Sequence, residues 1–207
     1  MAERTLIASS SYTVEVAVTT VGTISAGRAE FPWMRAPLDE VPAILETPDL
    51  VITSEAVALF IVGLRVFSTG IEARLEVRFK SGRPATEAVA ELQSLMQGDR
   101  ERGAGRLNFG MRYPDGALSE NLGMNASVSP ASRMDQGSPP LVTLSGRATV
   151  GSFAEVGYWC WPLPSDGGAT LFVSWLDQGL ELAEWPISAD ELGQAKARVR
   201  PLWRNQE

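Results

Sequence analysis

Residues 71–80 read Ile-Glu-Ala-Arg-Leu-Glu-Val-Arg-Phe-Lys, and this stretch decides the fold. Every odd position is apolar and every even position is charged, which is the two-residue period of a half-buried β-strand. Strands of parallel sheets are usually apolar on both faces, whereas antiparallel strands often keep one face in water. The sequence therefore predicts a mainly β fold with antiparallel pairing.

The segment before this strand is the most hydrophobic part of the chain. It covers residues 50–67, and Ser68-Thr69-Gly70 supplies turn residues, so residues 50–80 predict a β-hairpin. Residues 56–67 carry two apolar faces: Ala58, Phe60, Val62, Leu64 and Val66 on one, and Val57, Leu59 and Ile61 on the other. One face of such a strand should be wet, so the second apolar face needs a cover. The cover is a helix over residues 84–97, the proline-rich crossing over residues 32–48 or a second subunit, and Val57, Leu59 and Ile61 are the candidate interface residues.

Further elements are expected on both sides of the hairpin. The period of two predicts strands over residues 12–20, 107–113, 141–150, 156–163, 169–176 and 180–187, the last four forming a meander. A second helix should start at the capping box Ser188/Glu191 and stop at Pro201. Four prolines predict an irregular crossing over residues 32–48, which Phe31 and Trp33 should anchor by packing against the rest of the protein. Residues 119–140 predict a mobile loop without a strand.

These elements predict one domain over residues 1–207. The architecture expected is a two-sheet antiparallel β-sandwich with two short helices, and a flattened β-barrel is the alternative.

Composition excludes several classes of function. The chain has 18 Lys and Arg against 25 Asp and Glu, a net charge of −7, which repels nucleic acid and anionic membranes. It has no His, the commonest general base and metal ligand. It has one cysteine, no apolar stretch long enough to span a bilayer and no signal-peptide pattern at Met1, so a cytoplasmic location is expected.

Four tryptophans fall in neighbouring predicted strands: Trp159, Trp161, Trp175 and Trp185. Aromatic rings can form a platform on which a sugar or another flat ligand stacks. Tryptophan is also a normal core residue of a sandwich, and several of these positions alternate with residues expected to face inward. The core is the default interpretation, and the ligand platform is its alternative.

No residue pattern points to a catalytic, cofactor or metal site. Cys160 has no His or basic neighbour in sequence to activate it, so a buried structural thiol is expected. Asp115, Asp166 and Asp177 occupy predicted turns, where Asp bonds the local backbone; a carboxylate pair for calcium or glycoside cleavage is the alternative. A basic cluster near the C-terminus has a solvated face as its default interpretation and an acidic partner as its alternative. It consists of Lys196, Arg198, Arg200 and Arg204.

Several short motifs resemble a family of uncharacterised, β-rich actinomycete proteins. They are Trp161-Pro162-Leu163-Pro164, Leu171-Phe172-Val173-Ser174-Trp175, the terminal Pro201-Leu202-Trp203, and residues 107–116 with their Tyr-Pro-Asp-Gly turn. The resemblance implies a bacterial, cytoplasmic, β-rich protein and no reaction.

Three classes of function follow. The first is a non-enzymatic interaction or structural module that contacts a protein partner or a second copy of itself in a bacterial assembly. The second is a small-molecule or carbohydrate-binding module that uses the tryptophans. The third is an enzyme, a hydrolase based on carboxylates.

Overall fold

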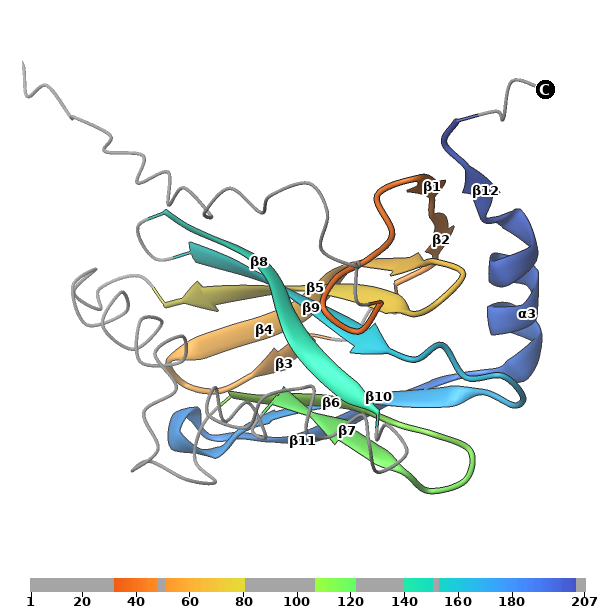
Figure 1. The fold of residues 1–207 in the computed structure, drawn as a ribbon. Helices are drawn as coiled ribbons and strands as arrows, with labels where there is room; N and C mark the ends of the chain where they lie inside the picture. Colours follow the sequence, from red (N-terminus) through yellow and green to blue (C-terminus); the bar gives the residue numbers. More distant parts are fainter. Residues whose placement is uncertain (1–31, 48–50, 81–106, 122–139, 151–152, 204–207) are drawn as a thin grey trace, which may run out of the picture. The chain divides into compact units, whose positions relative to one another are not determined.

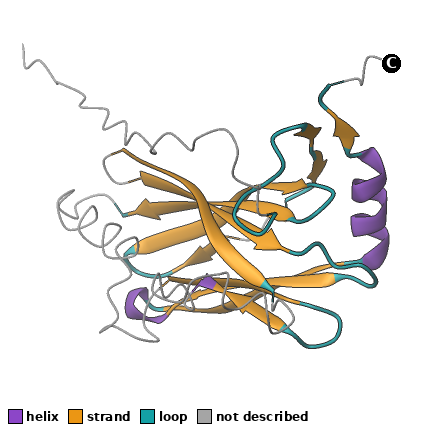
Figure 2. Ribbon diagram, in the orientation of Figure 1, coloured by secondary structure: helices purple, strands orange, loops and turns teal. Residues whose placement is uncertain are grey.

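Strands make up most of the chain that the computed structural model describes, namely residues 32–47, 51–80, 107–121, 140–150 and 153–203 (Figure 2). These residues all belong to the unit Phe31–Glu207; the other unit, Met1–Glu30, lies outside the described residues, as does the strand expected over residues 12–20. The single domain over residues 1–207 therefore stays a prediction.

The described strands form three antiparallel sheets (Figure 1). The largest has the order β2-β4-β5-β9-β8, with β3 also paired to β4; the second has the order β11-β10-β6-β7; the third is a two-stranded ribbon of β1 and β12. The bounds are β1 Glu40–Val41, β2 Ala43–Leu45, β3 Val51–Thr53, β4 Val57–Val66, β5 Ile71–Phe79, β6 Leu107–Arg112, β7 Leu118–Glu120, β8 Leu141–Val150, β9 Phe153–Trp161, β10 Ala169–Trp175, β11 Leu180–Ile187 and β12 Arg200–Pro201. The described strands pair antiparallel, which confirms the mainly β antiparallel class. No sheet closes on itself in this part of the chain, so the barrel alternative is wrong.

The predicted hairpin is confirmed, with one correction to its first strand. β4 and β5 pair antiparallel, but a bulge between Ile61 and Gly63 adds one residue to β4. The extra residue shifts the alternation by one, so Leu64 and Val66 join Val57, Leu59 and Ile61 on the buried face. The two apolar faces expected from a strict period of two are therefore wrong after Val62.

The outer face of the largest sheet is covered by charge pairs. Its ion pairs join Arg65 to Glu72, Arg74 to Glu155 and Arg78 to Glu76, and the Arg78 guanidinium also lies 5.2 Å from the ring centre of Phe60. Glu76 and Glu155 lie opposite each other in the β5–β9 register, and Arg78 and Arg74 offset the repulsion. The charged face expected for residues 71–80 is thus present from Arg74 onward, whereas Glu72 is buried.

Aromatic contacts join the largest sheet to the second one. The ring of Phe109 on β6 stacks on that of Tyr158 on β9 with centroids 4.7 Å apart, and Phe79 meets Trp175 edge to face at 6.3 Å. Residues of both sheets belong to one buried hydrophobic cluster.

A half-buried amide links the same two sheets. The Asn121 side chain accepts a hydrogen bond from the Phe109 amide at 2.8 Å and donates to the Leu107 carbonyl at 3.0 Å. Its Nδ2 also lies 3.2 Å from the hydroxyl of Tyr158. The side chain thereby continues the pairing of β7 with β6 and satisfies a buried hydroxyl.

Other predicted elements need smaller corrections. The crossing over residues 32–48 contains the short strands β1 and β2, separated by Pro42, and Trp33 is buried as expected, whereas Phe31 lies outside the described residues. The loop expected over residues 119–140 starts late, because β7 continues through Glu120; residues 122–139 are not described. The expected meander is wrong: β8 and β9 pair in one sheet and β10 and β11 in the other. The C-terminal helix is confirmed as α3, Ala189–Arg198, and the helix expected over residues 84–97 lies outside the described chain.

Substituting Ile61→Glu should destabilise the protein by about 3 kcal/mol or more, because it buries a carboxylate without a partner. Ile61 is 4% exposed, whereas its neighbour Val62, at the bulge, is 40% exposed. Val62→Glu is therefore the matched control, with an expected change within about 0.5 kcal/mol. Urea unfolding measures both. Equal stability of the two variants would contradict the register assigned to β4.

Candidate interaction surface

The C-terminal residues follow directly after the helix α3, which is capped at its start and packed against the core. Ser188 caps the helix: its hydroxyl accepts from the Glu191 amide at 3.2 Å, and the Glu191 carboxylate accepts from the Ser188 amide at 2.7 Å. Leu192 and Ala195 bury one face of the helix in the hydrophobic cluster. The helix ends at Val199, which is extended, because Pro201 cannot continue it.

After Val199 the chain pairs with the segment that follows Leu38. β12 lies antiparallel to β1, with Glu40 opposite Pro201 and Val41 opposite Arg200. One more hydrogen bond, from the Leu202 amide to the Asp39 carbonyl at 2.6 Å, extends the pairing. This ribbon lies beside the C-terminal end of α3, as Figure 1 shows.

Two further hydrogen-bonding links hold the ribbon in place. The Glu40 carboxylate accepts from the amide of Ser68 at 2.9 Å and from its hydroxyl, which fixes β1 to the turn between β4 and β5. The Arg198 guanidinium donates to the carbonyl of Ile44 at 3.2 Å, at the edge of the largest sheet. The backbone that carries the following residues is therefore fixed at several points.

The ribbon presents three large apolar side chains to solvent. Trp203 is 70% exposed, Leu38 63% and Leu202 47%. The pairing ends at the Leu202–Asp39 hydrogen bond, and Leu38 and Trp203 are the next residues of the two segments. We call Leu38, Leu202 and Trp203 the ribbon patch. Composition alone did not predict it; the only sequence signal was an aromatic residue shortly after a proline that ends a helix.

The charges around the ribbon patch differ in sign from the chain as a whole. Lys196, Arg198 and Arg200 are exposed, and Arg204 lies outside the described residues. Of the two acidic residues on the β1 side, Glu40 is bound to Ser68 and Asp39 is exposed. The described surface of the ribbon is therefore locally basic, on a chain whose net charge is −7.

The four tryptophans expected to share a platform lie in different environments. Trp175 and Trp185 belong to the hydrophobic cluster, whereas Trp159 is buried on the opposite face of β9. There its indole NH donates to the carbonyl of Pro32 at 3.0 Å and Phe67 packs edge to face against the ring at 5.6 Å. Trp161 is half-buried. No accessible face therefore brings the four rings together.

The structure also shows where the other candidate residues lie. Val57, Leu59 and Ile61 are buried in the hydrophobic cluster of their own chain, together with residues of the second sheet. The Asp115 carboxylate accepts from the Ala117 amide at 2.9 Å, the turn contact that its neighbours predicted. Asp166 and Asp177 lie before and after β10, at opposite ends of that strand. Among the described residues no three acidic, Cys or His side chains cluster in a way that could hold a metal ion.

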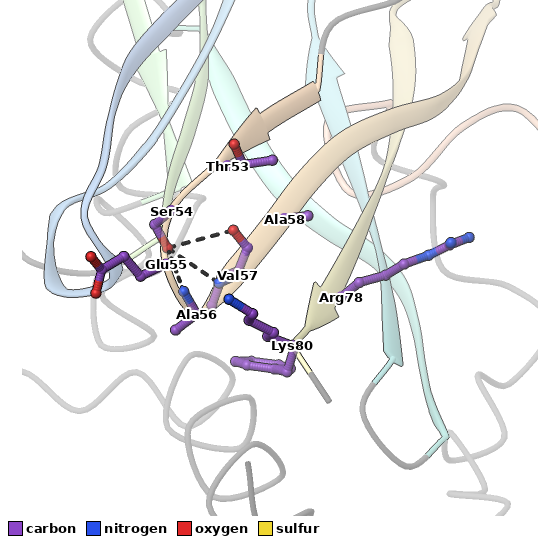
Figure 3. Close-up of a pocket in the computed structure, with 9 residues that line it drawn as sticks. Thr53, Ser54, Glu55, Ala56, Val57, Ala58, Arg78 and Lys80 are labelled. Carbon is purple, nitrogen blue, oxygen red and sulfur yellow. Dashed lines mark hydrogen bonds between the residues drawn. The ribbon is translucent and has the colours of Figure 1, made fainter. Parts of the chain in front are cut away.

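One open pocket of about 280 Å³ lies where the β3–β4 turn meets the end of β5 (Figure 3). Its central hydroxyl, from Ser54, already accepts from the amides of Ala56 at 3.3 Å and Val57 at 3.2 Å. Figure 3 shows Glu55 and Arg78 pointing away from each other on opposite sides. The lining groups therefore do not converge on a ligand.

Cys160 is a buried thiol, as expected. It is fully enclosed, and burial raises its pKa far above the ordinary value. Burial also raises the pKa of Tyr113, whose hydroxyl donates to the carbonyl of Pro162 at 2.8 Å, and that of Tyr158. These groups stay neutral in the folded protein, so Cys160 has no thiolate with which to act as a nucleophile.

Comparison of the chain with protein-family models, with curated proteins and with solved structures gave no match. No helix in the described part of the chain is both long and apolar enough to cross a membrane. The resemblance to actinomycete proteins stays a prediction.

Trp203 should dominate the quenching of tryptophan fluorescence by acrylamide, because it is the most exposed indole of the six in the chain. Trp203→Phe should remove most of the quenching. Trp161→Phe, which changes a half-buried ring, is the matched control and should remove less. An unchanged Stern–Volmer constant in Trp203→Phe would mean that the ribbon patch is covered in solution.

Stability should fall as the pH rises above about 8.5, where the Cys160 thiol ionises only in the unfolded chain. The folded-state pKa is raised, so the folded protein keeps its proton while the unfolded state is stabilised by losing it, and the slope approaches about 1.4 kcal/mol per pH unit. Tyr113 and Tyr158 add to it above about pH 10.

Urea unfolding between pH 7 and 10 measures this dependence. Cys160→Ala should show a shallower decline between about pH 8.5 and 10, whatever its stability at neutral pH. Parallel curves for the two proteins would contradict a thiol held neutral by burial.

Proposed function

We propose that this chain is a non-enzymatic interaction module that binds a protein partner through the ribbon patch. One observation carries the proposal: Trp203 is 70% exposed directly after Leu202, whose amide is hydrogen-bonded to the Asp39 carbonyl. Tryptophan is among the residues that contribute most to protein interfaces, because its large ring is buried on binding at a low cost in side-chain entropy.

The neighbours of Trp203 support a contact surface of the usual type. Leu38 and Leu202 are further exposed apolar side chains of the ribbon, and exposed charged residues lie on it as well, which supports an apolar centre with a polar rim. The patch is small, which fits a partner segment that contacts a few side chains rather than a large permanent interface.

The scaffold and setting are part of the same proposal. The two larger sheets are proposed to form a sandwich, supported by the ring contacts Phe109–Tyr158 and Phe79–Trp175 between them. The module is proposed to act in the cytoplasm of a bacterial cell, within an assembly. A lone, buried cysteine supports this setting, since it leaves the chain without a disulfide.

Affinity purification of the tagged full-length chain from the cells that express it tests the proposal. Proteins recovered by the wild type should be reduced about tenfold or more in Trp203→Ala and in Leu202→Ser. Leu182→Ser is the matched control, because the exposure of Leu182, 58%, lies between those of Leu202 and Trp203, but it is on β11, in another sheet. A partner recovered equally by the wild type and both ribbon variants would contradict the proposal, as would a loss shared by Leu182→Ser.

A further inference from the structure

The ribbon patch lies next to basic side chains that the fold leaves in solvent. Lys196 in the last turn of α3 and Arg200 on β12 are both exposed, and neither forms an ion pair with a described residue. By contrast, the arginines of the outer sheet face, Arg65, Arg74 and Arg78, are all paired with glutamates. Lys196 and Arg200 thus keep unneutralised positive charge in the segment that leads to Trp203.

The acidic residues nearest in the fold do not cancel this charge. Both carboxylate oxygens of Glu40 accept hydrogen bonds from Ser68, and those of Asp190 and Glu191 lie at the other end of α3, where Glu191 belongs to the helix cap. Asp39 is the one exposed carboxylate on the described part of the ribbon. A binding segment would therefore meet an apolar centre bordered mainly by cations.

We infer that the ribbon patch binds an acidic segment of a partner protein, in which Asp or Glu side chains flank an apolar residue. The apolar residue packs against Trp203 and Leu202, and the carboxylates face Lys196 and Arg200. This inference rests on the proposed function and names the chemistry of the partner. Charge complementarity of this kind chooses among partners and speeds association more than it adds affinity.

A protein segment fits this surface better than a membrane or a nucleic acid does. An anionic bilayer or a duplex meets a whole face of the molecule, and the net charge of −7 opposes its approach. A short peptide meets only the ribbon, whose local charge is positive. The acidic segment is therefore the occupant that the charges favour.

Selection from a random-peptide display library on the full-length chain tests the inference without a known partner. Peptides that bind the wild type and not Trp203→Ala should be enriched in Asp and Glu next to an apolar or aromatic residue. Enrichment of neutral or basic peptides, or of none that depend on Trp203, would overturn the inference.

Charge-neutralising variants then test the role of the cations. The dissociation constant of a selected peptide should rise roughly fivefold in the double variant Lys196→Gln/Arg200→Gln, and salt should weaken binding less than in the wild type. Lys80→Gln, which removes an exposed cation at the end of β5, is the matched control and should change neither. Unchanged affinity and salt dependence in the double variant would overturn the inference.

Fluorescence quenching gives a readout that needs no partner. With each ion's quenching normalised to that of free N-acetyltryptophanamide, iodide should quench Trp203 more strongly than caesium does, because the local potential is positive, and Lys196→Gln/Arg200→Gln should reduce this difference while leaving acrylamide quenching unchanged. Equal quenching by the two ions in the wild type would overturn the inference.

Two measurements distinguish an acidic segment from the other occupants of the ribbon patch. Sedimentation with phosphatidylserine vesicles that depends on Trp203 would assign the patch to a membrane, and self-association lost in Trp203→Ala would assign it to a second copy; either result overturns the inference. The proposed function fails separately, when the recovery of partners is insensitive to Trp203. If recovery depends on Trp203 but not on the two cations, the module remains and only the acidic partner is excluded.

Discussion

The single extra residue in β4 is the constraint on which the rest of the structure depends. Ten residues with a strict alternation would place the apolar side chains of β4 on both faces of the sheet. The bulge at Val62 brings Leu64 and Val66 to the same face as Val57, Leu59 and Ile61, so one continuous apolar surface results. The opposite face is then free to carry Arg65, which pairs with Glu72 on β5, so the sheet has one dry side and one side that carries charge pairs. The second sheet packs on the dry side, and the segment of Pro32 covers Trp159 on the other.

On the dry side, two kinds of contact join the sheets. The stacked rings of Phe109 and Tyr158 and the edge contact of Phe79 with Trp175 supply apolar area. Asn121 adds directed hydrogen bonds. Just after β7, its side-chain amide bonds to the backbone of β6 and also lies within hydrogen-bond distance of the Tyr158 hydroxyl. A buried polar group is tolerated only when it is hydrogen-bonded, so this contact restricts how the two sheets meet. Burial of Cys160 in the same cluster raises the pKa of its thiol and keeps it neutral.

At the edge of the largest sheet, several contacts hold α3 and the ribbon in place. Leu192 and Ala195 hold the helix to the core, Arg198 binds the carbonyl of Ile44, and Glu40 ties β1 to the hairpin turn. A side chain displayed on such a backbone loses little further conformational freedom on binding, which lowers the entropic cost of association. This is the physical reason for treating an exposed Trp203 as a binding residue and not as an incidental apolar side chain.

The sequence by itself determined the local elements. The alternation over residues 71–80, the turn at Ser68-Thr69-Gly70, the capping box at Ser188 and the stop at Pro201 all depend on neighbours in the chain, and each is present. The bulge, the separation of β8–β9 from β10–β11, and the separate surroundings of Trp159, Trp175 and Trp185 were decided only by the tertiary structure. Pairing partners come from distant parts of the chain, and a shift of one residue reverses every face of a strand. The ribbon patch belongs to the same class: Leu38 and Trp203 are far apart in sequence, and only the pairing of β1 with β12 brings their segments together.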